Sequence, residues 1–321
     1  MAASRNSRQP ELLQRVGDFL ATHLTASTPV VLGLSGGCDS VTLLHLLHQL
    51  LPAGLLRACH IHHGLSAHAD DWAAFCAQTC AQLRVPLNIH RVTVDRDSGL
   101  GLEAAARQAR YAIFAREQGC LLLAQHADDQ AETVLFNLLR GTGLTGAAGM
   151  LPARCQGPLR ILRPLLNVSR AEIEVYARQQ ALRWVDDESN EDTRFSRNFL
   201  RRDILPQLSQ RFPAAVASLT QAAAHFAEAG DLLDELAGAD WGRLAVGDCV
   251  PIPALRTLSL ARLKNLLRYR LRQLAWRVPV RRRLEEFCRQ LQAAGTDRHP
   301  ELQLLDGVMR VQAGALCWVV A

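Results

Sequence analysis

Short apolar runs alternate with helical patterns along the first half of the chain. Four of these runs predict buried strands: Pro29–Leu34, Leu56–His63, Leu87–Val94 and Cys120–Gln125. Helical patterns follow each of them, up to about Leu51, from Ser66 to Leu83, over Glu103–Gly119 and over Asp128–Arg140. Strands and helices in strict alternation predict an α/β fold, a parallel sheet covered by helices on both faces.

The second half changes in pattern. Arg140–Met150 is rich in glycine, which predicts a mobile loop. Beyond Phe212 the composition shifts, and two long amphipathic helices are expected over Ala214–Gly238 and Leu255–Ala275. We therefore expect a catalytic domain over residues 1–212 and a smaller, mainly helical domain over residues 213–321.

Length and composition are typical of a globular protein of two domains. The chain has 321 residues, of which 49% are hydrophobic and 21% charged. No apolar run approaches the roughly 20 residues that span a bilayer, and the first residues lack the apolar core of a signal peptide. These features predict a cytoplasmic protein without a membrane partner.

The nine cysteines are scattered, and none forms a C-x-x-C pair. Cys76 and Cys80 are the closest, about one helical turn apart. We expect the cysteines to be small buried side chains in a reducing compartment, because a zinc site would need tighter clustering of ligands.

Positive charge is carried almost entirely by arginine. The net charge is +5, and Lys264 is the single lysine among 36 basic residues. The segment from Arg256 to Arg298 holds twelve basic and three acidic side chains. A solvated helix face could be this basic, but regional clustering favours a surface for a phosphate backbone. The candidate contacts in this segment are Arg268, Arg272, Arg281 and Arg282.

The sequence LSGGCDS follows the first predicted strand. Ser35, Gly36 and Gly37 form a tight turn whose amides can face an anion, and Asp39 and Ser40 open the next helix, where phosphate binding is favourable. The alternative is a pair of helix-capping residues after a glycine turn. A carboxylate beside a triphosphate needs a cation between them, which makes Asp39 a candidate Mg²⁺ ligand. Such a loop suits adenylation, in which pyrophosphate leaves.

Two carboxylates, Asp129 and Glu132, lie three residues apart after the fourth predicted strand and share one helix face. They would repel each other unless a cation joins them. Asp128 is a further candidate for this set, and helix capping is the alternative for Asp128 and Asp129.

Other polar residues have competing interpretations. His62 and His63 end the second strand and could be ordinary strand-end histidines or part of a metal-binding HxHH pattern. Arg107 and Arg110 could lie on a solvated helix face. Arg197 and Arg201 suit the neutralisation of phosphoryl charge, although a helix cap or a salt bridge explains either one equally well.

Five stretches occur in an informative order: Ser35–Ser40, His60–Cys76, Glu103–Tyr111, His126–Met150 and Trp184–Leu208. The first resembles the loop of the PP-loop, or N-type ATP pyrophosphatase, superfamily. Together they resemble the bacterial tRNA(Ile)-lysidine synthase family. The resemblance covers Val30 to Leu208 strongly and the tail more weakly, and longer members of the family carry a further domain.

The resemblance implies ATP-dependent ligation of free L-lysine to C2 of the wobble cytidine of tRNA(Ile) with a CAU anticodon, through an adenylated intermediate. It implies that ATP contacts Ser35, Gly36, Gly37, Cys38, Asp39, Ser40, His62 and His63, with Mg²⁺ on Asp39. It places the substrate lysine on Asp129 and Glu132, catalytic roles on Arg107 and Arg201, and tRNA contacts on Arg197 and Arg201. The glycine-rich loop would close over the site, and analogy with the family suggests a homodimer.

Two alternatives remain on sequence grounds. A tRNA thiolation enzyme shares the loop but needs cysteines that carry sulfur or hold a cluster, and C-x-x-C is missing. A non-catalytic RNA-binding protein on the same fold would explain the basic tail, but not the intact SGGCDS and HADDQAET sequences.

Overall fold

The computed structural model describes residues 8–64, 66–94, 101–186, 196–293 and 299–320. Residues 187–195 of the stretch WVDDESNEDTRFSRNFLRRDILPQL, and residues 294–298 of the basic segment, lie outside these ranges. The chain divides into two compact units, one ending at Phe226 and the other beginning at Ala227. The boundary expected after residue 212 falls between two helices of the first unit and stays a prediction.

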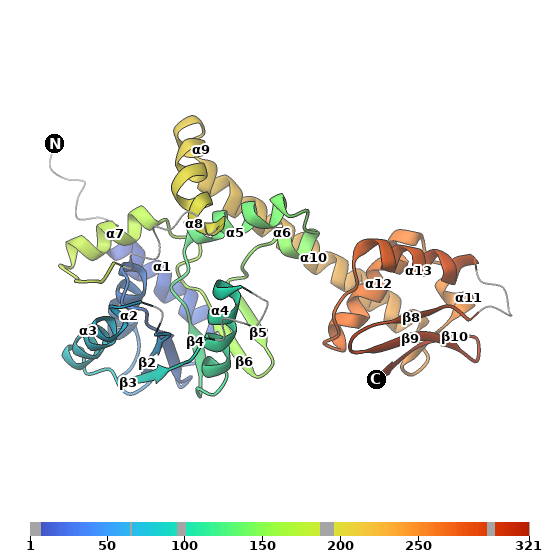
Figure 1. Cartoon of the computed structure of the whole chain (residues 1–321), viewed down its shortest axis with the longest axis horizontal. Helices are drawn as coiled ribbons and strands as arrows, with labels where there is room; N and C mark the ends of the chain where they lie inside the picture. The colour runs from blue at the N-terminus through green and yellow to red at the C-terminus, as the bar shows by residue number, and fades with distance from the viewer. Residues whose placement is uncertain (1–7, 65, 95–100, 187–195, 294–298, 321) are drawn as a thin grey trace. The chain divides into compact units, whose positions relative to one another are not determined.

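The first unit is built on a six-stranded sheet with the order β3-β2-β1-β4-β6-β5 (Figure 1). Its parallel strands are β1 (Val30–Gly33), β2 (Leu56–His62), β3 (Leu87–Arg91), β4 (Cys120–Leu122) and β6 (Leu159–Leu162). β5 (Ala153–Gln156) pairs with β6 in the antiparallel sense at the edge. The predicted parallel sheet is confirmed, and each of the four predicted strands is present in shortened form.

Helices cover the sheet, and β1 is buried on both faces. They are α1 (Arg8–His23), α2 (Cys38–Leu50), α3 (Ala69–Gln82), α4 (Leu102–Phe114), α5 (Ala127–Leu139) and α7 (Arg170–Gln179). Val30 and Leu32 pack in a cluster that contains the leucines of α2, whereas Val31 packs in a second cluster with Phe114 of α4. Because successive side chains of β1 enter two different apolar layers, its sequence is a continuous apolar run.

The order of the strands creates a topological switch beside β1. From β1 the chain moves outward to β2 and β3, and then returns to place β4 on the opposite side of β1. The loops that follow β1 and β4 therefore diverge at the carboxyl ends of neighbouring strands, which is where open α/β sheets bind ligands.

The glycine-rich segment after α5 is not wholly irregular. It contains the short helix α6 (Leu144–Ala147), so the prediction of a loop throughout was wrong. Two side chains of α5 hold it: Asn137 donates to the carbonyl of Gly146 at 2.7 Å, and the buried Gln130 donates to the carbonyl of Met150 at 2.9 Å. These bonds satisfy backbone groups that a loop would otherwise expose.

A run of helices closes the first unit. α8 (Ser196–Phe199) continues into a π-helical turn, η2 (Leu200–Ile204), and then into α9 (Leu205–Arg211) and the long α10 (Ala215–Leu244), whose residues from Ala227 onward belong to the second unit. Short π-helical segments often occur at functional sites, and η2 carries Arg201. Within the described ranges, no helix is both long enough and apolar enough to cross a membrane, the 30-residue α10 included.

The second unit combines helices with a small antiparallel sheet. The helices are α11 (Ile252–Leu255), α12 (Leu260–Gln273) and α13 (Arg281–Ala293), and the strands are β7 (Cys249–Pro251), β8 (Glu301–Gln303), β9 (Gly307–Gln312) and β10 (Ala315–Val320). The sheet order is β7-β10-β9-β8. The expected helical content is confirmed, but the sheet was not predicted.

Two cysteines depart from the expectation that all would be free. Cys249 and Cys317 lie opposite each other on β7 and β10 and form a disulfide. Six of the seven free cysteines are buried, as expected, and Cys155 is exposed. The two bonded residues are 68 positions apart, so their spacing in the sequence offers no signal of the bond.

A substitution at Gly119, directly before β4, tests how closely this segment packs against the start of β1. Its φ is +120°, and an added Cβ would lie 2.6 Å from the carbonyl oxygen of Pro29, which accepts the amide of Cys120. We expect Gly119→Ala to lower the free energy of unfolding by about 2–4 kcal/mol, through strain and overpacking. Gly54 also has a positive φ but no atom within 4 Å of an added Cβ, so Gly54→Ala should cost only about 1 kcal/mol. Equal losses for the two variants in urea denaturation would contradict this reading.

Candidate active site

The loop after β1 is a tight turn wound around one hydroxyl group. Ser40 Oγ accepts hydrogen bonds from the amides of Ser35 and Gly36, both at 3.2 Å, and donates to the carbonyl of Gly37 at 3.0 Å. Gly36 has φ +92°, and an added Cβ would lie 2.9 Å from a methyl of Val185, so glycine is required here. The amides expected to face a phosphate thus contact serine hydroxyls within the loop.

Cys38 and Asp39 begin α2 directly after this turn. Cys38 is buried, and burial raises the pKa of its thiol to about 11, which keeps the thiol uncharged at neutral pH. Asp39 Oδ2 accepts from Arg170 Nη1 at 2.5 Å and lies 3.7 Å from His126 Nε2. Burial raises the pKa of Asp39, although the charges of His126 and Arg170 oppose it. Its Oδ1 is buried and has no hydrogen-bond partner among the described residues.

The loop after β4 brings a second set of charged groups to Asp39. His126 caps α5 and lies within 3.5–3.7 Å of carboxylate oxygens of Asp39, Asp128 and Asp129. Burial lowers the pKa of His126, but the contact with Asp128 and the charges of the other two aspartates outweigh it and raise the pKa overall. Asp128 also accepts the backbone amide of Arg170 at 2.8 Å.

Arg201 joins the two carboxylates that the sequence pairs on α5. Its Nε donates to Glu132 Oε1 at 2.5 Å, and its Nη2 donates to Glu132 Oε2 at 3.0 Å and to Asp129 Oδ1 at 2.8 Å. Glu132 is 3% exposed, and this burial raises its pKa, although Arg201 acts in the opposite direction. The expected shared face of Asp129 and Glu132 is thus occupied by a cation, and that cation is a guanidinium of the chain itself.

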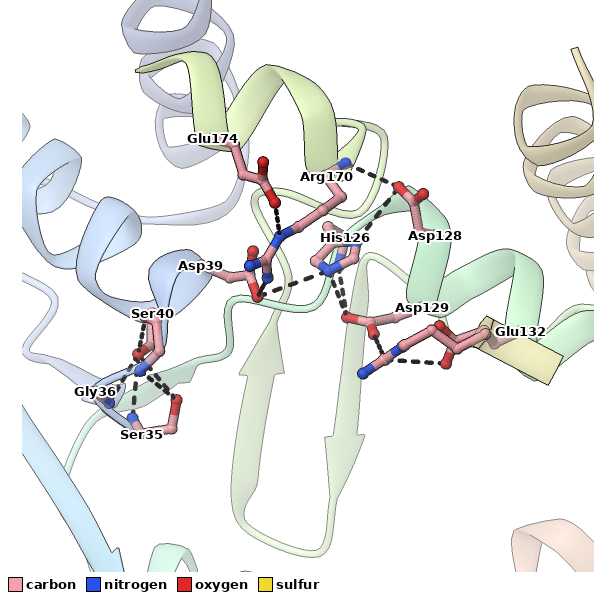
Figure 2. Close-up of polar contacts among 12 residues, drawn as sticks. Ser35, Gly36, Asp39, Ser40, His126, Asp128, Asp129, Glu132, Arg170 and Glu174 are labelled. Atoms are coloured by element: carbon pink, nitrogen blue, oxygen red, sulfur yellow. Dashed lines mark hydrogen bonds and ion pairs between the residues drawn. The ribbon is translucent and has the colours of Figure 1, made fainter. Parts of the chain in front are cut away.

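Negative charge dominates this group of side chains, shown in Figure 2. We name it the acidic cluster, and its described members are Asp39, Asp128, Asp129, Glu132, Glu174, Arg170, Arg201 and His126. Five carboxylates thus face two guanidinium groups and one imidazole. A partly buried excess of carboxylates attracts further cations, so the cluster fits Mg²⁺ or an ammonium group.

Arg170 and His126 are members that the sequence analysis missed. Arg170 is the first residue of α7, and its Nε also donates to Glu174 at 3.0 Å. The capping box formed by Ser169 and Glu172 could have located the start of this helix. The pairing itself joins residues 131 positions apart, and no spacing rule reaches that far.

The two histidines at the end of β2 lie in different surroundings. His62 is buried, with its Nε2 at 3.1 Å from Asp70 Oδ1. Burial lowers the pKa of His63 to about 4, with further contributions from the charges of Arg110, His60 and His62. The Nδ1 of this neutral His63 is buried without a hydrogen-bond partner among the described residues. His63 therefore has an unused polar atom for a ligand, whereas Nε2 of His62 already contacts Asp70.

Several predicted arginines lie outside the acidic cluster. Arg107 Nη2 donates to the hydroxyl of Tyr111 at 3.4 Å on its own helix. The guanidinium carbon of Arg197 lies 6.0 Å from the ring centre of Phe136. Their catalytic and tRNA-binding roles stay predictions.

The four arginines selected in the second unit differ in their surroundings. Arg272 forms an ion pair with Asp234 of α10, so a role in phosphate binding would compete with that pair. Arg281 is 84% exposed and lies 3.6 Å from Glu285. Arg282 is exposed and Arg268 is half-buried.

Comparison with known proteins identifies the family of the chain. A family model described as a PP-loop domain matches residues 8–208, and one described as a TilS substrate binding domain matches residues 251–317. The chain is 48% identical over 306 residues to the tRNA(Ile)-lysidine synthase of Pseudomonas aeruginosa, covering 89% of this chain and 68% of that protein. It is 46% identical over 305 residues to the enzyme of the same name from Nitrosomonas europaea, covering 93% of this chain and 67% of that protein.

A solved structure supports the fold alone. The U34-tRNA thiolase NcsA from Methanococcus maripaludis superposes with a TM-score of 0.58 at 19% identity, over 69% of this chain and 80% of that one. The family models and the curated relatives carry the conclusion further: this chain belongs to the tRNA(Ile)-lysidine synthase family, with a PP-loop domain followed by a TilS substrate binding domain.

Proposed function

We propose that the chain ligates free L-lysine to C2 of the wobble cytidine of tRNA(Ile) with a CAU anticodon. ATP is the activating substrate, and AMP and pyrophosphate are released. One observation carries the proposal. Asp129 and Glu132 already bind a planar cation through three hydrogen bonds, beside the loop that ends β1. A site built to hold a positive group next to a nucleotide loop suits an amine that attacks an adenylated base.

The loop would hold the nucleotide and its metal. Ser35, Gly36, Gly37, Cys38, Asp39 and Ser40 are the residues that would meet the phosphates, with the adenosine near His62 and His63. Asp39 fits Mg²⁺ because its buried Oδ1 has no hydrogen-bond partner in the described ranges. When bound, Mg²⁺ neutralises the pyrophosphate that leaves.

The reaction requires two bond exchanges. The oxygen on C2 of the cytidine attacks the α-phosphorus of ATP and pyrophosphate leaves. The ε-amine of lysine then forms the C2–N bond, and AMP leaves with that oxygen. The amine must lose protons, and burial, which raises the pKa of Glu132, makes its carboxylate a better proton acceptor than an exposed one. Arg201, once displaced by lysine, would be available to neutralise charge on the departing phosphate.

The RNA would be held by arginines. Arg197 lies in the first unit, and Arg268, Arg272, Arg281 and Arg282 lie in the second unit, whose match to a substrate-binding domain supports this role. Arginine suits phosphate because its fork of donors binds two oxygens at once. Since tRNA is the substrate, we place the reaction in the cytoplasm.

Labelled lysine tests the activity directly. With ATP, Mg²⁺ and total bacterial tRNA, label should enter one isoleucine tRNA, with AMP and pyrophosphate released in equal amounts. Asp39→Asn should lower this rate about 100-fold or more while the Kd for tRNA stays unchanged. Asp18→Asn, which alters an exposed acid of α1, is the control. Transfer of sulfur instead of lysine, or full activity in Asp39→Asn, would refute the proposal.

The raised pKa of Glu132 predicts how lysine binding depends on pH. Its carboxyl takes up a proton at a higher pH than an exposed glutamate, so lysine affinity is present above that pKa and falls as the pH drops through it. Glu132→Gln should weaken lysine binding about 30-fold or more and remove this step from the pH profile of the KM for lysine. Glu172→Gln should keep the wild-type profile. An unchanged step in Glu132→Gln would assign the titration to another group.

Two arginines that share Glu174 allow a matched test of charge compensation. Arg170 bonds to both Glu174 and Asp39, whereas Arg178 bonds to Glu174. Without Mg²⁺, Arg170→Ala should lower the free energy of unfolding by about 1–3 kcal/mol, and Arg178→Ala by about 0.5 kcal/mol or less. Added Mg²⁺ should restore part of the loss in Arg170→Ala, because the metal would replace the guanidinium beside Asp39. The same stability in both variants, with and without Mg²⁺, would speak against this role of Asp39.

A further inference from the structure

A thiol, an imidazole and a carboxylate meet on the face of the first sheet that packs against α4. Cys59 lies in β2, His90 lies in β3, and Glu117 follows the end of α4. One ligand atom of each residue, the Sγ of Cys59, a ring nitrogen of His90 and a carboxylate oxygen of Glu117, lies within 4.8 Å of the other two. We name these three residues the Cys–His–Glu group, and none of them belongs to the acidic cluster.

The register of the strands brings two of these side chains to one face. In the parallel pair of β2 and β3, Cys59 is opposite Asn88 and Ile61 is opposite His90. Residues two apart on a strand share a face, so Cys59, Asn88 and His90 lie on the same side of the sheet. Cys59 packs there in one apolar cluster with Phe114 of α4.

A turn at the end of α4 places Glu117 beside these strands. The amide of Glu117 donates to the carbonyl of Phe114 at 3.2 Å. Its Oε1 lies 2.8 Å from Nε2 of His90, and both of its carboxylate oxygens accept from Nδ2 of Asn88 at 3.3 Å. A carboxylate that a neighbouring amide orients is the usual arrangement of a metal ligand and its supporting residue. Glu117 precedes β4, whereas the carboxylates of α5 follow that strand.

The three ligand atoms are spaced close to what a metal ion requires. Ligand atoms at about 2.0–2.3 Å from tetrahedral zinc lie roughly 3.3–3.6 Å from one another. The contact of 2.8 Å between His90 and Glu117 would open slightly, and the other separations, at most 4.8 Å, would close by about 1 Å. Small rotations of the side chains produce such shifts while the strands stay in place.

Solvent reaches the group from one side. Cys59 is 1% exposed, whereas the side chains of Glu117 and His90 are 10% and 36% exposed. β3 is the edge strand of the sheet (Figure 1), so the imidazole lies at an open margin. An ion can enter there, and water can complete the fourth position, as it does in zinc sites with three protein ligands.

We propose that Cys59, His90 and Glu117 bind one Zn²⁺ ion, at a site separate from the acidic cluster. The ligand set selects this class of ion, because thiolate and imidazole suit zinc whereas Mg²⁺ takes oxygen ligands. One thiolate and one carboxylate balance the two charges of the ion, so the filled site is neutral and burial of it costs less. The inference does not depend on the proposed function.

Binding exchanges a proton for the metal. Burial and the nearby carboxylate of Glu117 raise the pKa of Cys59 to about 12, so the thiol is protonated in the metal-free chain. When the bond from Sγ to the metal forms, that proton leaves to solvent. His90 binds as the neutral imidazole through Nε2, with its proton on Nδ1, and Glu117 binds as the carboxylate.

The ion would join three segments of the first unit: β2, β3 and the turn between α4 and β4. His90 and Glu117 alone are 27 positions apart, so the tight spacing that marks many zinc sites in a sequence is absent. Because the unfolded chain does not hold these ligands together, Zn²⁺ would favour the folded state and raise the Tm.

Titration with Co²⁺ tests the site, because a thiolate bound to this ion gives an intense charge-transfer band in the near ultraviolet. The whole chain, freed of metal with a chelator, should develop this band and saturate at one equivalent of Co²⁺. Zn²⁺ should abolish the band, since nitrogen and sulfur sites bind it more tightly than Co²⁺. Excess Mg²⁺ should leave the band unchanged.

Variants of the ligands and of their neighbours assign the band. Cys59→Ser should abolish it, and His90→Gln and Glu117→Gln, which alter less buried side chains, should remove the saturation at one equivalent. Asn88→Ala should raise the Kd for Co²⁺ about 10-fold, because the amide orients the carboxylate. The matched control is Cys155→Ser, which removes the exposed free thiol and should keep both the band and the Kd.

The Tm provides a second measurement that does not depend on the thiolate band. Zn²⁺ should raise the Tm of the wild type and of Cys155→Ser, but not that of His90→Gln. The inference is overturned if the wild type gives no band at one equivalent, or if the band persists in Cys59→Ser. An equal rise of the Tm in His90→Gln and in the wild type would place the stabilising ion elsewhere and would also overturn it.

Discussion

Mutual repulsion among carboxylates is the constraint on which the site depends. Asp39 comes from the first turn of α2 after β1, and Asp128, Asp129 and Glu132 come from α5 after β4. Like charges this close, in partly buried surroundings, repel each other by roughly several kcal/mol. They stay together because Arg170, Arg201 and His126 lie between them. The two guanidinium groups and the imidazole do not balance all five carboxylates of the acidic cluster, so the site attracts a further cation.

The sheet prevents the carboxylates from relieving that repulsion by moving apart. β1 is buried in apolar layers on both faces, and β4 is hydrogen-bonded along it. The two loops start from adjacent strand ends at the topological switch, so their separation is set by strand spacing. The π-helical turn η2 then delivers Arg201 from a distant part of the chain. A rigid apolar layer thus supports a polar layer whose charges must be balanced by cations.

The sequence allowed the parallel sheet and the location of the site to be predicted, because both follow from short-range patterns. Apolar runs define the strands, and the polar residues that follow them lie at one edge. The spacing of Asp129 and Glu132 predicted their shared face, with a cation between them. Arg170 could not be assigned, since its contact with Asp39 depends on where α7 docks. The strands of the second unit are short, from three to six residues, and too weakly patterned to be distinguished from loops.

The two arginines of the acidic cluster balance negative charge, but they do not donate or accept protons during a reaction. A guanidinium remains protonated at any physiological pH, so neither Arg170 nor Arg201 can become a nucleophile. No lysine occurs in the first 263 residues, and Lys264 lies near Glu285 in the second unit. The first unit therefore has no lysine side chain of its own that could reach Glu132. Under the proposed function, the burial that raises the pKa of Glu132 would serve two steps, because the same carboxylate would attract the ammonium and accept its proton. In that proposal, recognition of the nucleophile and its activation would both depend on a single buried side chain.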